Sequence, residues 1–255
     1  MLPYLDPPPL VLGSLRIELW HFLVTVAILI GHFGIVRVAG RRGLDTLVAA
    51  EMSLSAIGAG LVGAHVFKFA YRPDLLAEGV TVIVRRSAGI ASFGGILGGL
   101  LAAFVYLRVR RQPIACYLDV IAFVFPFAWI FGRSGCAVSH DHPGAPSASW
   151  LAVGFPHGSR YDLGLLEVFF TLAVAALFLL LARRQRPAGF WLGLLLSLYG
   201  PFRLLLDQLH VDPPRYFGVT VDQYAASLAT ALGIATLAFL SNSPHNGAWP
   251  GDQAE

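Results

Sequence analysis

Long apolar stretches recur along this chain and constrain its fold more than any other feature. About 20 apolar residues in a helix span the hydrocarbon core of a bilayer, and stretches of that length fill most of the 255 residues. Charged residues make up only 13%, against about 25% in soluble domains. The pattern predicts an all-α integral membrane protein, a bundle of about seven transmembrane helices. The expected spans are 16–36, 46–70, 88–107, 114–133, 163–182, 189–209 and 219–240.

Arginine clusters follow every second predicted span. They lie at 37–42, 108–111 and 183–186, which a chain with about seven spans places on one side of the membrane. The positive-inside rule makes that side cytoplasmic, so we expect the N-terminus outside and the C-terminus inside. Arg85 and Arg86, in an outer loop, are an exception. Because topology accounts for the net charge of +3, nucleic-acid binding is not expected.

No separate soluble domain is expected at either end of the chain. Residues 1–15 lack the positive start and the small-residue cleavage site of a signal peptide, so the first span is expected to stay in the mature protein. Residues 1–240 are predicted to form a single polytopic membrane domain and residues 241–255 a polar tail. Cys116 and Cys136 lie at opposite ends of the fourth span, about 30 Å apart, too far for a disulfide.

Several ionisable residues lie within predicted spans, where each costs at least about 2.5–3.5 kcal/mol at the bilayer centre. Arg203 and Asp207 share a helix face, which His210 extends. Because arginine keeps its charge, a buried Arg203 needs Asp207, a carboxylate of another span or a bound phosphate as its partner. Arg133 needs one too, and two such arginines would suit a phospholipid headgroup. Structural pairing is an equally good interpretation for His21, Glu51, His65 and Glu167, and it is the favoured one for Glu18 and Asp119, which look near-interfacial.

The third predicted span is rich in glycine. Gly94, Gly95, Gly98 and Gly99 recur at four-residue spacing, which lets two helices approach closely. Plain helix packing is the simpler interpretation of this pattern. A loosened helix end beside a ligand pocket is the functional alternative.

The stretch FGRSGCAVSHDHPG, at 131–144, concentrates polar groups at the end of the fourth span. His140, Asp141 and His142 invite a metal interpretation, but two histidines and an aspartate without helical spacing are a weak zinc signal. Metal-dependent hydrolysis in the membrane would need a motif such as His-Glu-x-x-His, which the sequence lacks. Histidines that transfer protons, or are simply solvated, are the better interpretation. We therefore expect no bound metal.

Several short motifs follow one another in a defined order. They are PPLVLGSLRIELWHF (8–22), GAH (63–65), SFGGILGG (92–99), DVIA (119–122), GRSGCA (132–137) and YGPFRLLLDQLH (199–210). Their order over nearly the whole chain resembles the prolipoprotein diacylglyceryl transferases of bacteria, whose hallmark is Gly-Arg-x-Gly-Asn-Phe at the end of a span. The chain is identified as a divergent member of that family.

The resemblance implies transfer of a diacylglyceryl group from phosphatidylglycerol to the lipobox cysteine of a prolipoprotein signal peptide, with release of glycerol phosphate. It implies a multi-pass protein of the bacterial inner membrane, with an active site facing the outer side and no cofactor; we expect a monomer. Arg133 and Arg203 match family arginines and are expected to bind the phosphate. The residues expected to support them are Glu167, Gly94, Gly95, Gly132 and Gly135.

The chain departs from the family at motif positions that bear on the chemistry. The histidine usual before the paired glycines of the third span is Phe93, and the asparagine after Gly-Arg-x-Gly is Cys136. In the last motif, Asp207 and His210 stand for a glutamate and a second arginine. These departures favour one alternative, a non-catalytic membrane protein that binds phospholipid or lipoprotein.

The expected chemistry needs a base for the substrate thiol and cations for the phosphate leaving group. The substrate supplies the nucleophile. We expect the base among His142, His140 and His210, with Asp207 beside them. His142 is the first choice, because Pro143 disfavours helix at the preceding residue and should hold it in an exposed loop.

Overall fold

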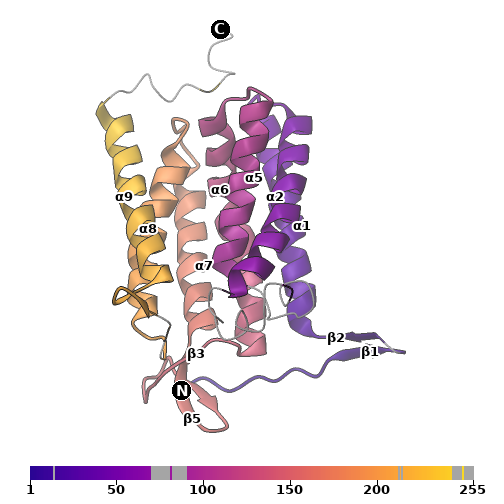
Figure 1. Ribbon diagram of the computed structural model, residues 1–255, viewed down its shortest axis with the longest axis vertical. Coiled ribbons are helices and arrows are strands. Elements are labelled where there is room, and N and C mark those ends of the chain that lie inside the picture. The colour runs from indigo at the N-terminus through magenta and orange to yellow at the C-terminus, as the bar shows by residue number, and fades with distance from the viewer. Residues whose placement is uncertain are drawn as a thin grey trace.

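Seven helices long and apolar enough to cross a membrane lie side by side in one bundle (Figure 1). The computed structural model describes residues 1–13, 15–69, 81, 91–211, 213, 215–242 and 249. The predicted all-α membrane class with seven long apolar helices is confirmed. The bounds differ in places: residues 16–17 and 219–220 are in strands, and the fourth helix runs on to Ser139. Residues 70 and 88–90 of the predicted second and third spans lie outside the described residues. The helices are α1 (Leu19–Arg41), α2 (Thr46–Lys68), α5 (Ser92–Val109), α6 (Ile114–Ser139), α7 (Leu163–Leu181), α8 (Phe190–Asp207) and α9 (Val221–Asn242).

Carboxylates mark the starts of three helices, where backbone N–H groups have no partner within the helix. Asp45 caps α2 by accepting from Leu47 N at 2.8 Å. Asp162 caps α7 by accepting from Leu165 N at 3.0 Å. Asp119 on α6 is fully buried and accepts from Leu192 N, in the first turn of α8, at 2.9 Å. Of the two interpretations open for Asp119, structural pairing is therefore the one that the geometry supports.

Glycines let neighbouring helices touch backbone to backbone. A Cβ added at Gly94 would lie 2.4 Å from the Gly63 carbonyl oxygen, and one at Gly98 would lie 2.7 Å from the Ala59 oxygen. One at Gly95 would touch the Ala64 Cβ at 3.4 Å. These contacts hold α5 against α2 and support the packing interpretation of the glycine-rich span, including Gly94 and Gly95.

Helix α6 occupies a central place because it packs against α1 on one side and α7 and α8 on the other. A Cβ at Gly135 would lie 3.5 Å from the Trp20 carbonyl oxygen of α1, and one at Gly132 would lie 3.9 Å from Ala27 Cβ. Gly164 on α7 lies equally close to α6, since its added Cβ would be 3.0 Å from Ala137 N. Gly132 and Gly135 thus allow α6 to approach α1.

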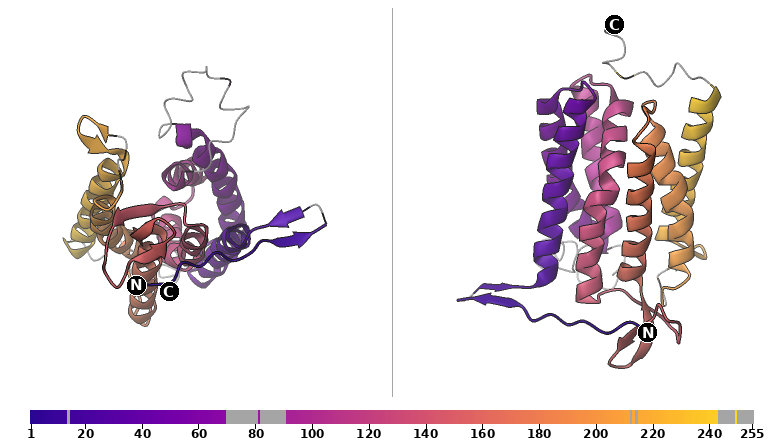
Figure 2. Two further views of the ribbon diagram at one scale, coloured as in Figure 1. Left: turned by 90° about the horizontal axis from the view of Figure 1, so that it is seen from below. Right: turned by 180° about the vertical axis from the view of Figure 1, so that it is seen from behind.

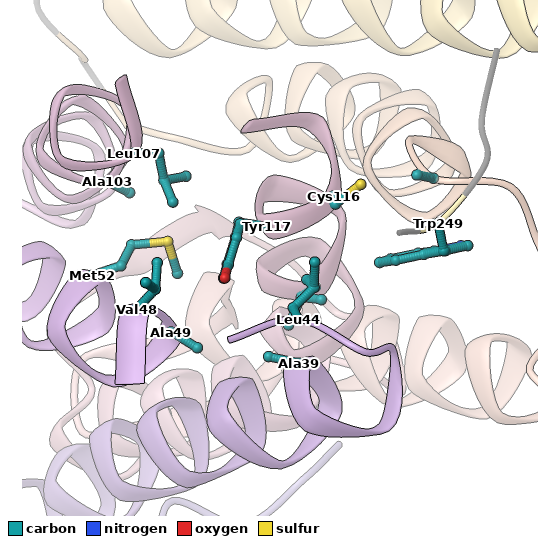
Figure 3. Packing of buried hydrophobic residues seen from close by; sticks show 12 residues of the cluster. Ala39, Leu44, Val48, Ala49, Met52, Ala103, Leu107, Cys116, Tyr117 and Trp249 are labelled. Carbon is teal, nitrogen blue, oxygen red and sulfur yellow. The ribbon is translucent and has the colours of Figure 1, made fainter. Parts of the chain in front are cut away.

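One end of the bundle, which we call the basic end, holds the arginine clusters where α1, α5 and α7 terminate (Figure 1). An apolar cluster fills it (Figure 3), made of Ala39, Leu44, Val48, Ala49, Met52, Ala103, Leu107, Cys116, Tyr117, Val120, Ala188 and Trp249. Trp249 is 5% exposed, and its Nε1 donates to the Arg186 carbonyl oxygen at 2.9 Å. Trp249 belongs to the stretch 241–255 that was predicted to be a polar tail; residues 243–248 and 250–255 of that stretch lie outside the described residues.

The opposite end, which we call the site end, carries the N-terminus and small antiparallel strands that the sequence analysis did not predict (Figures 1 and 2). A three-stranded sheet has the order β3-β5-β4, with β3 (Pro143–Pro146), β4 (Val153–Phe155) and β5 (Gly158–Asp162). A hairpin of β1 (Leu10–Leu12) and β2 (Leu15–Ile17) projects sideways, and β6 (Arg215–Tyr216) pairs with β7 (Val219–Thr220).

Backbone hydrogen bonds join the three-stranded sheet to the N-terminus on one side and to the end of α8 on the other. Leu2 N donates to the Ala152 carbonyl oxygen at 2.8 Å, and Ala145 N donates to the Leu209 carbonyl oxygen at 2.8 Å. The segment after α6 is therefore fastened beside the segment after α8, although they lie far apart in the sequence.

Candidate active site

Glu167 joins the two arginines that the sequence analysis singled out. Its Oε1 lies 3.0 Å from Arg133 Nε, and its Oε2 accepts from Arg203 NH1 at 3.2 Å. The side chains of Glu167 and Arg133 are 1% and 5% exposed, and that of Arg203 is 17% exposed. The partner of both arginines is thus a carboxylate of another span, one of the alternatives that the sequence left open.

Two aromatic residues complete the surroundings of Glu167. Trp129 Nε1 donates to Glu167 Oε1 at 2.7 Å, and the Tyr199 hydroxyl donates to the same oxygen at 2.5 Å. The Arg133 guanidinium lies 4.8 Å from the centroid of the Trp129 ring, a cation–π contact. Side chains of α6, α7 and α8 therefore hold one carboxylate in a fixed position.

Arg203 has a second carboxylate partner, which the sequence analysis missed. Its NH2 donates to Asp222 Oδ2 at 2.8 Å, and Asp222 lies in the first turn of α9. The two arginines carry two positive charges, and Glu167 supplies only one negative charge. Asp222 supplies the second, so the four side chains together are neutral. Arg203, the less buried of the two arginines, is thus the one that also contacts Asp222.

Asp207 and His210 form a separate pair on the same end of α8. Thr220 Oγ1 donates to the buried Asp207 at 2.9 Å. His210 Nδ1 lies 3.5 Å from Asp207 Oδ1 and makes no aligned hydrogen bond to any residue that the structure describes. Burial lowers the pKa of His210, and the neighbouring Arg203 lowers it further. His210 is therefore neutral at pH 7.

His140 has a structural position instead of facing the arginines. It ends α6 in a left-handed conformation with φ of 50°, and its side chain is 8% exposed. Its Nδ1 lies 2.6 Å from Asp162 Oδ2, and its Nε2 lies 3.0 Å from the Leu5 carbonyl oxygen. With Tyr4 stacked on its ring at 4.1 Å, His140 ties the N-terminus to α6 and α7. The structure thus argues against His140 as the base.

His142 forms a compact cluster with Asp141 and Cys136. Its Nδ1 lies 2.5 Å from Asp141 Oδ1, and ligand atoms of all three side chains lie within 4.8 Å of one another. Burial lowers the pKa of His142, but contacts with Asp141 and Cys136 outweigh burial and raise that pKa to about 9. The Cys136 Sγ lies 3.7 Å from Arg133 NH1, so the cluster adjoins the buried arginine.

The backbone fixes this cluster. Past His140, residues 141 and 142 are non-helical, as Pro143 predicted, and the His142 carbonyl oxygen accepts from Leu163 N at the start of α7 at 3.1 Å. The sequence analysis treated Cys136 as a departure from a motif and as a cysteine too far from Cys116 for a disulfide, and did not place it in the site. Cys136 lies three residues before the end of α6 and just ahead of a loop that folds back. That position is the signal in the sequence that could have indicated its place in the cluster.

Among the described residues, seven helices long and apolar enough to cross a membrane, with two buried arginines and a cysteine–histidine cluster at one end, define a polytopic membrane protein. A family model described as prolipoprotein diacylglyceryl transferase matches residues 8–239. The chain belongs to this family.

Curated relatives with the name phosphatidylglycerol–prolipoprotein diacylglyceryl transferase agree with this assignment. One from Symbiobacterium thermophilum is 28% identical over 263 residues, covering 96% of each chain. One from Rhodospirillum rubrum is 30% identical over 226 residues, covering 80% of each chain. Transferase 1 of Clostridium perfringens is 23% identical and covers 91% of this chain and 94% of its own length. The similarity extends along the whole bundle.

Proposed function

We propose that this chain transfers a diacylglyceryl group from phosphatidylglycerol to the lipobox cysteine thiol of prolipoproteins, a step of lipoprotein biosynthesis. The observation that carries the proposal is the match of the family model over residues 8–239. Arg133 and Arg203, at family motif positions, converge on Glu167. A buried pair of guanidinium groups is suited to a phosphodiester, because its planar donors match phosphate oxygens.

In the proposed reaction, the thiolate sulfur attacks the glyceryl carbon that carries the phosphate. A C–S bond forms, the C–O bond to phosphate breaks, and its electron pair leaves on the oxygen of glycerol phosphate. Arg203, the more exposed arginine, contacts the phosphate by exchanging Asp222 for it. Arg133, held by Glu167 and Trp129, adds positive charge behind it. Both arginines stabilise the charge that develops on the leaving group.

The thiol proton must leave by a route other than the third-span histidine of the family. Phe93 occupies that position and packs edge-on against the Phe67 ring at 5.1 Å. We assign the deprotonation to the His142 cluster, because it adjoins Arg133 through Cys136. His210 and Asp207 lie beside Arg203 and assist in positioning the phosphate.

Membrane orientation follows from the arginine clusters of the basic end, which we propose to be cytoplasmic. The site end then faces the outer side of the inner membrane, where prolipoproteins arrive. Reporter fusions at residues near 40, 110 and 185 should give cytoplasmic signals, and fusions at 150 should give outer signals. A cytoplasmic signal at 150 would contradict this orientation.

The direct test measures diacylglyceryl transfer by the purified protein from phosphatidylglycerol to a lipobox peptide. A peptide with serine in place of the cysteine is the matched control and should stay unmodified. Expression of the chain should also restore growth of a bacterium depleted of its own transferase. A protein that binds phosphatidylglycerol but transfers nothing in either assay would support the non-catalytic alternative, which the phenylalanine at position 93 favours.

A further inference from the structure

The cluster of Cys136, Asp141 and His142 consists of groups that ligate zinc. A thiolate, an imidazole nitrogen and a carboxylate oxygen are the zinc ligands of proteins, and three protein ligands with one open position are typical of catalytic sites. The metal interpretation of the sequence grouped His140 with Asp141 and His142. The structure turns His140 away toward Asp162 and brings Cys136 in from α6.

The geometry of the three side chains is close to that of a metal site. Zinc bonds of about 2.0–2.3 Å place the ligand atoms of a tetrahedral site roughly 3.3–3.6 Å apart, and these atoms lie within 4.8 Å of one another. Asp141 and His142 are only partly buried, so their side chains can move by the distance of about 1 Å that the bond lengths require. The backbone is fixed meanwhile by α6 and by the bond from Leu163 N to the His142 carbonyl oxygen.

We propose that Cys136, Asp141 and His142 bind a zinc ion whose fourth position takes the lipobox thiol of the acceptor. This inference deepens the proposed function and rests on it. Thiolate is a soft ligand that zinc prefers, and a coordinated thiol loses its proton. The proton passes to solvent, and the sulfur remains a nucleophile held at one point.

The location of the cluster matches that task. Cys136 Sγ lies 3.7 Å from Arg133 NH1, so a thiolate bound at the cluster would lie next to the proposed phosphate site. Attack then needs only the thiolate sulfur and the glyceryl carbon to meet between the two sites. Zinc would supply the thiolate that the family obtains with a histidine where this chain has Phe93.

A second arrangement of the same groups is a metal-free relay, in which Asp141 orients His142 and the neutral fraction of His142, small at pH 7 because its pKa is about 9, takes the thiol proton. The two arrangements differ in an observable way, because only zinc binding requires Cys136 as a third ligand and a metal in stoichiometric amount. Metal binding is therefore measured directly, with zinc and cobalt ions as probes.

The experiment uses the full chain in detergent, stripped with a chelator and titrated with Zn²⁺ and, separately, with Co²⁺. We expect one ion per chain and, with Co²⁺, a sulfur-to-metal charge-transfer band. Cys136→Ser, Cys136→Asn, Asp141→Asn and His142→Gln should each weaken binding at least about a hundredfold. The matched control is His157→Gln, an exposed histidine of the same end, which should bind as the parent does.

Adding a lipobox peptide should shift the cobalt band, whereas the serine peptide should leave it unchanged. Absence of stoichiometric binding by the parent, or equal binding by Cys136→Ser, would overturn the zinc proposal. A chelated parent that still transfers diacylglyceryl at full rate would also overturn it and leave the proposed function intact. Zinc binding with a shift by the peptide, in a protein that transfers nothing, would instead support the site and contradict the proposed function.

Discussion

The basic end and the site end of the bundle both bury polar groups, but they satisfy them differently. At the basic end, the two buried polar side chains of α6 contact backbone groups: Asp119 accepts from Leu192 N, and the Tyr117 hydroxyl donates to the Asp45 carbonyl oxygen at 3.2 Å. Tyr117 is itself a member of the apolar cluster at this end (Figure 3). At the site end, Glu167 receives contacts from four side chains on α6 and α8.

The difference teaches how to separate a structural charge from a functional one. Every buried charge needs compensation; Asp119 has backbone N–H donors at the start of α8 and no cationic partner among the described residues. The site end instead assembles more cationic donors than its central carboxylate needs, and one of them, Arg203, is 17% exposed. An accessible cation that shares its partners can take up an anionic ligand and itself remain paired.

Removing the arginines should have the largest effect. Arg133→Ala and Arg203→Ala are each expected to lower transfer by at least about 10²–10³-fold, because a donor to the leaving group is lost. Lysine should rescue only partly, since it lacks the planar fork. The control is Arg215→Ala, an exposed arginine of the site end, which should transfer at the parent rate. Full activity in either variant would remove that residue from the phosphate site.

Glu167→Gln and Asp119→Ala test the difference between the two ends by their effects on the free energy of unfolding. Glu167→Gln leaves two buried arginines short of a counter-charge and should cost about 3–5 kcal/mol. Asp119→Ala removes one cap at the basic end and should cost about 1–2 kcal/mol, with transfer per folded molecule unchanged. Unfolding of both variants in detergent, followed by circular dichroism, gives the two values. Equal losses at both ends would break the distinction.

His142 and His140 are expected to differ in the same way, one acting in the reaction and the other stabilising the fold. His142→Gln should lower turnover at least about a hundredfold while phosphatidylglycerol binding persists. His140→Gln should instead lower thermal stability, because it breaks the buried contact with Asp162, and folded protein should retain its turnover. Turnover and melting temperature of both variants decide the assignment. A His142→Gln variant that matches the parent from about pH 6 to 9 would refute the role of His142.

The smallest expected effect is the pH dependence due to His210. Its pKa lies below the unfolded value of about 6.5, so the native state binds fewer protons than the unfolded state. Stability is then fully present above pH 6.5 and is lost as pH falls through the folded pKa. The charged groups that face His210 are Asp207, Asp222, Arg203 and His142. His210→Gln should flatten the unfolding curve against pH over this window; an unchanged slope would contradict the assignment.

The sequence predicted the number and order of the helices, because apolar length and arginine placement depend only on local composition and on the bilayer. It also indicated Arg133 and Arg203 as the buried cations, since ionisable residues in an apolar run are recognisable without coordinates. The short strands of the site end escaped it. The stretches 143–146 and 153–155 are too short and carry no alternating pattern that would predict a strand.

The sequence by itself determined a seven-helix membrane protein of the prolipoprotein diacylglyceryl transferase family, with two arginines near one end. Only the tertiary structure decided their partners, because Glu167 and Asp222 come from helices whose rotation the sequence does not specify. The tertiary structure also places His140 and His142 in different surroundings, although they are two residues apart in the chain. A single left-handed residue at the end of α6 reverses the backbone, so one histidine packs against the N-terminus and the other meets Cys136.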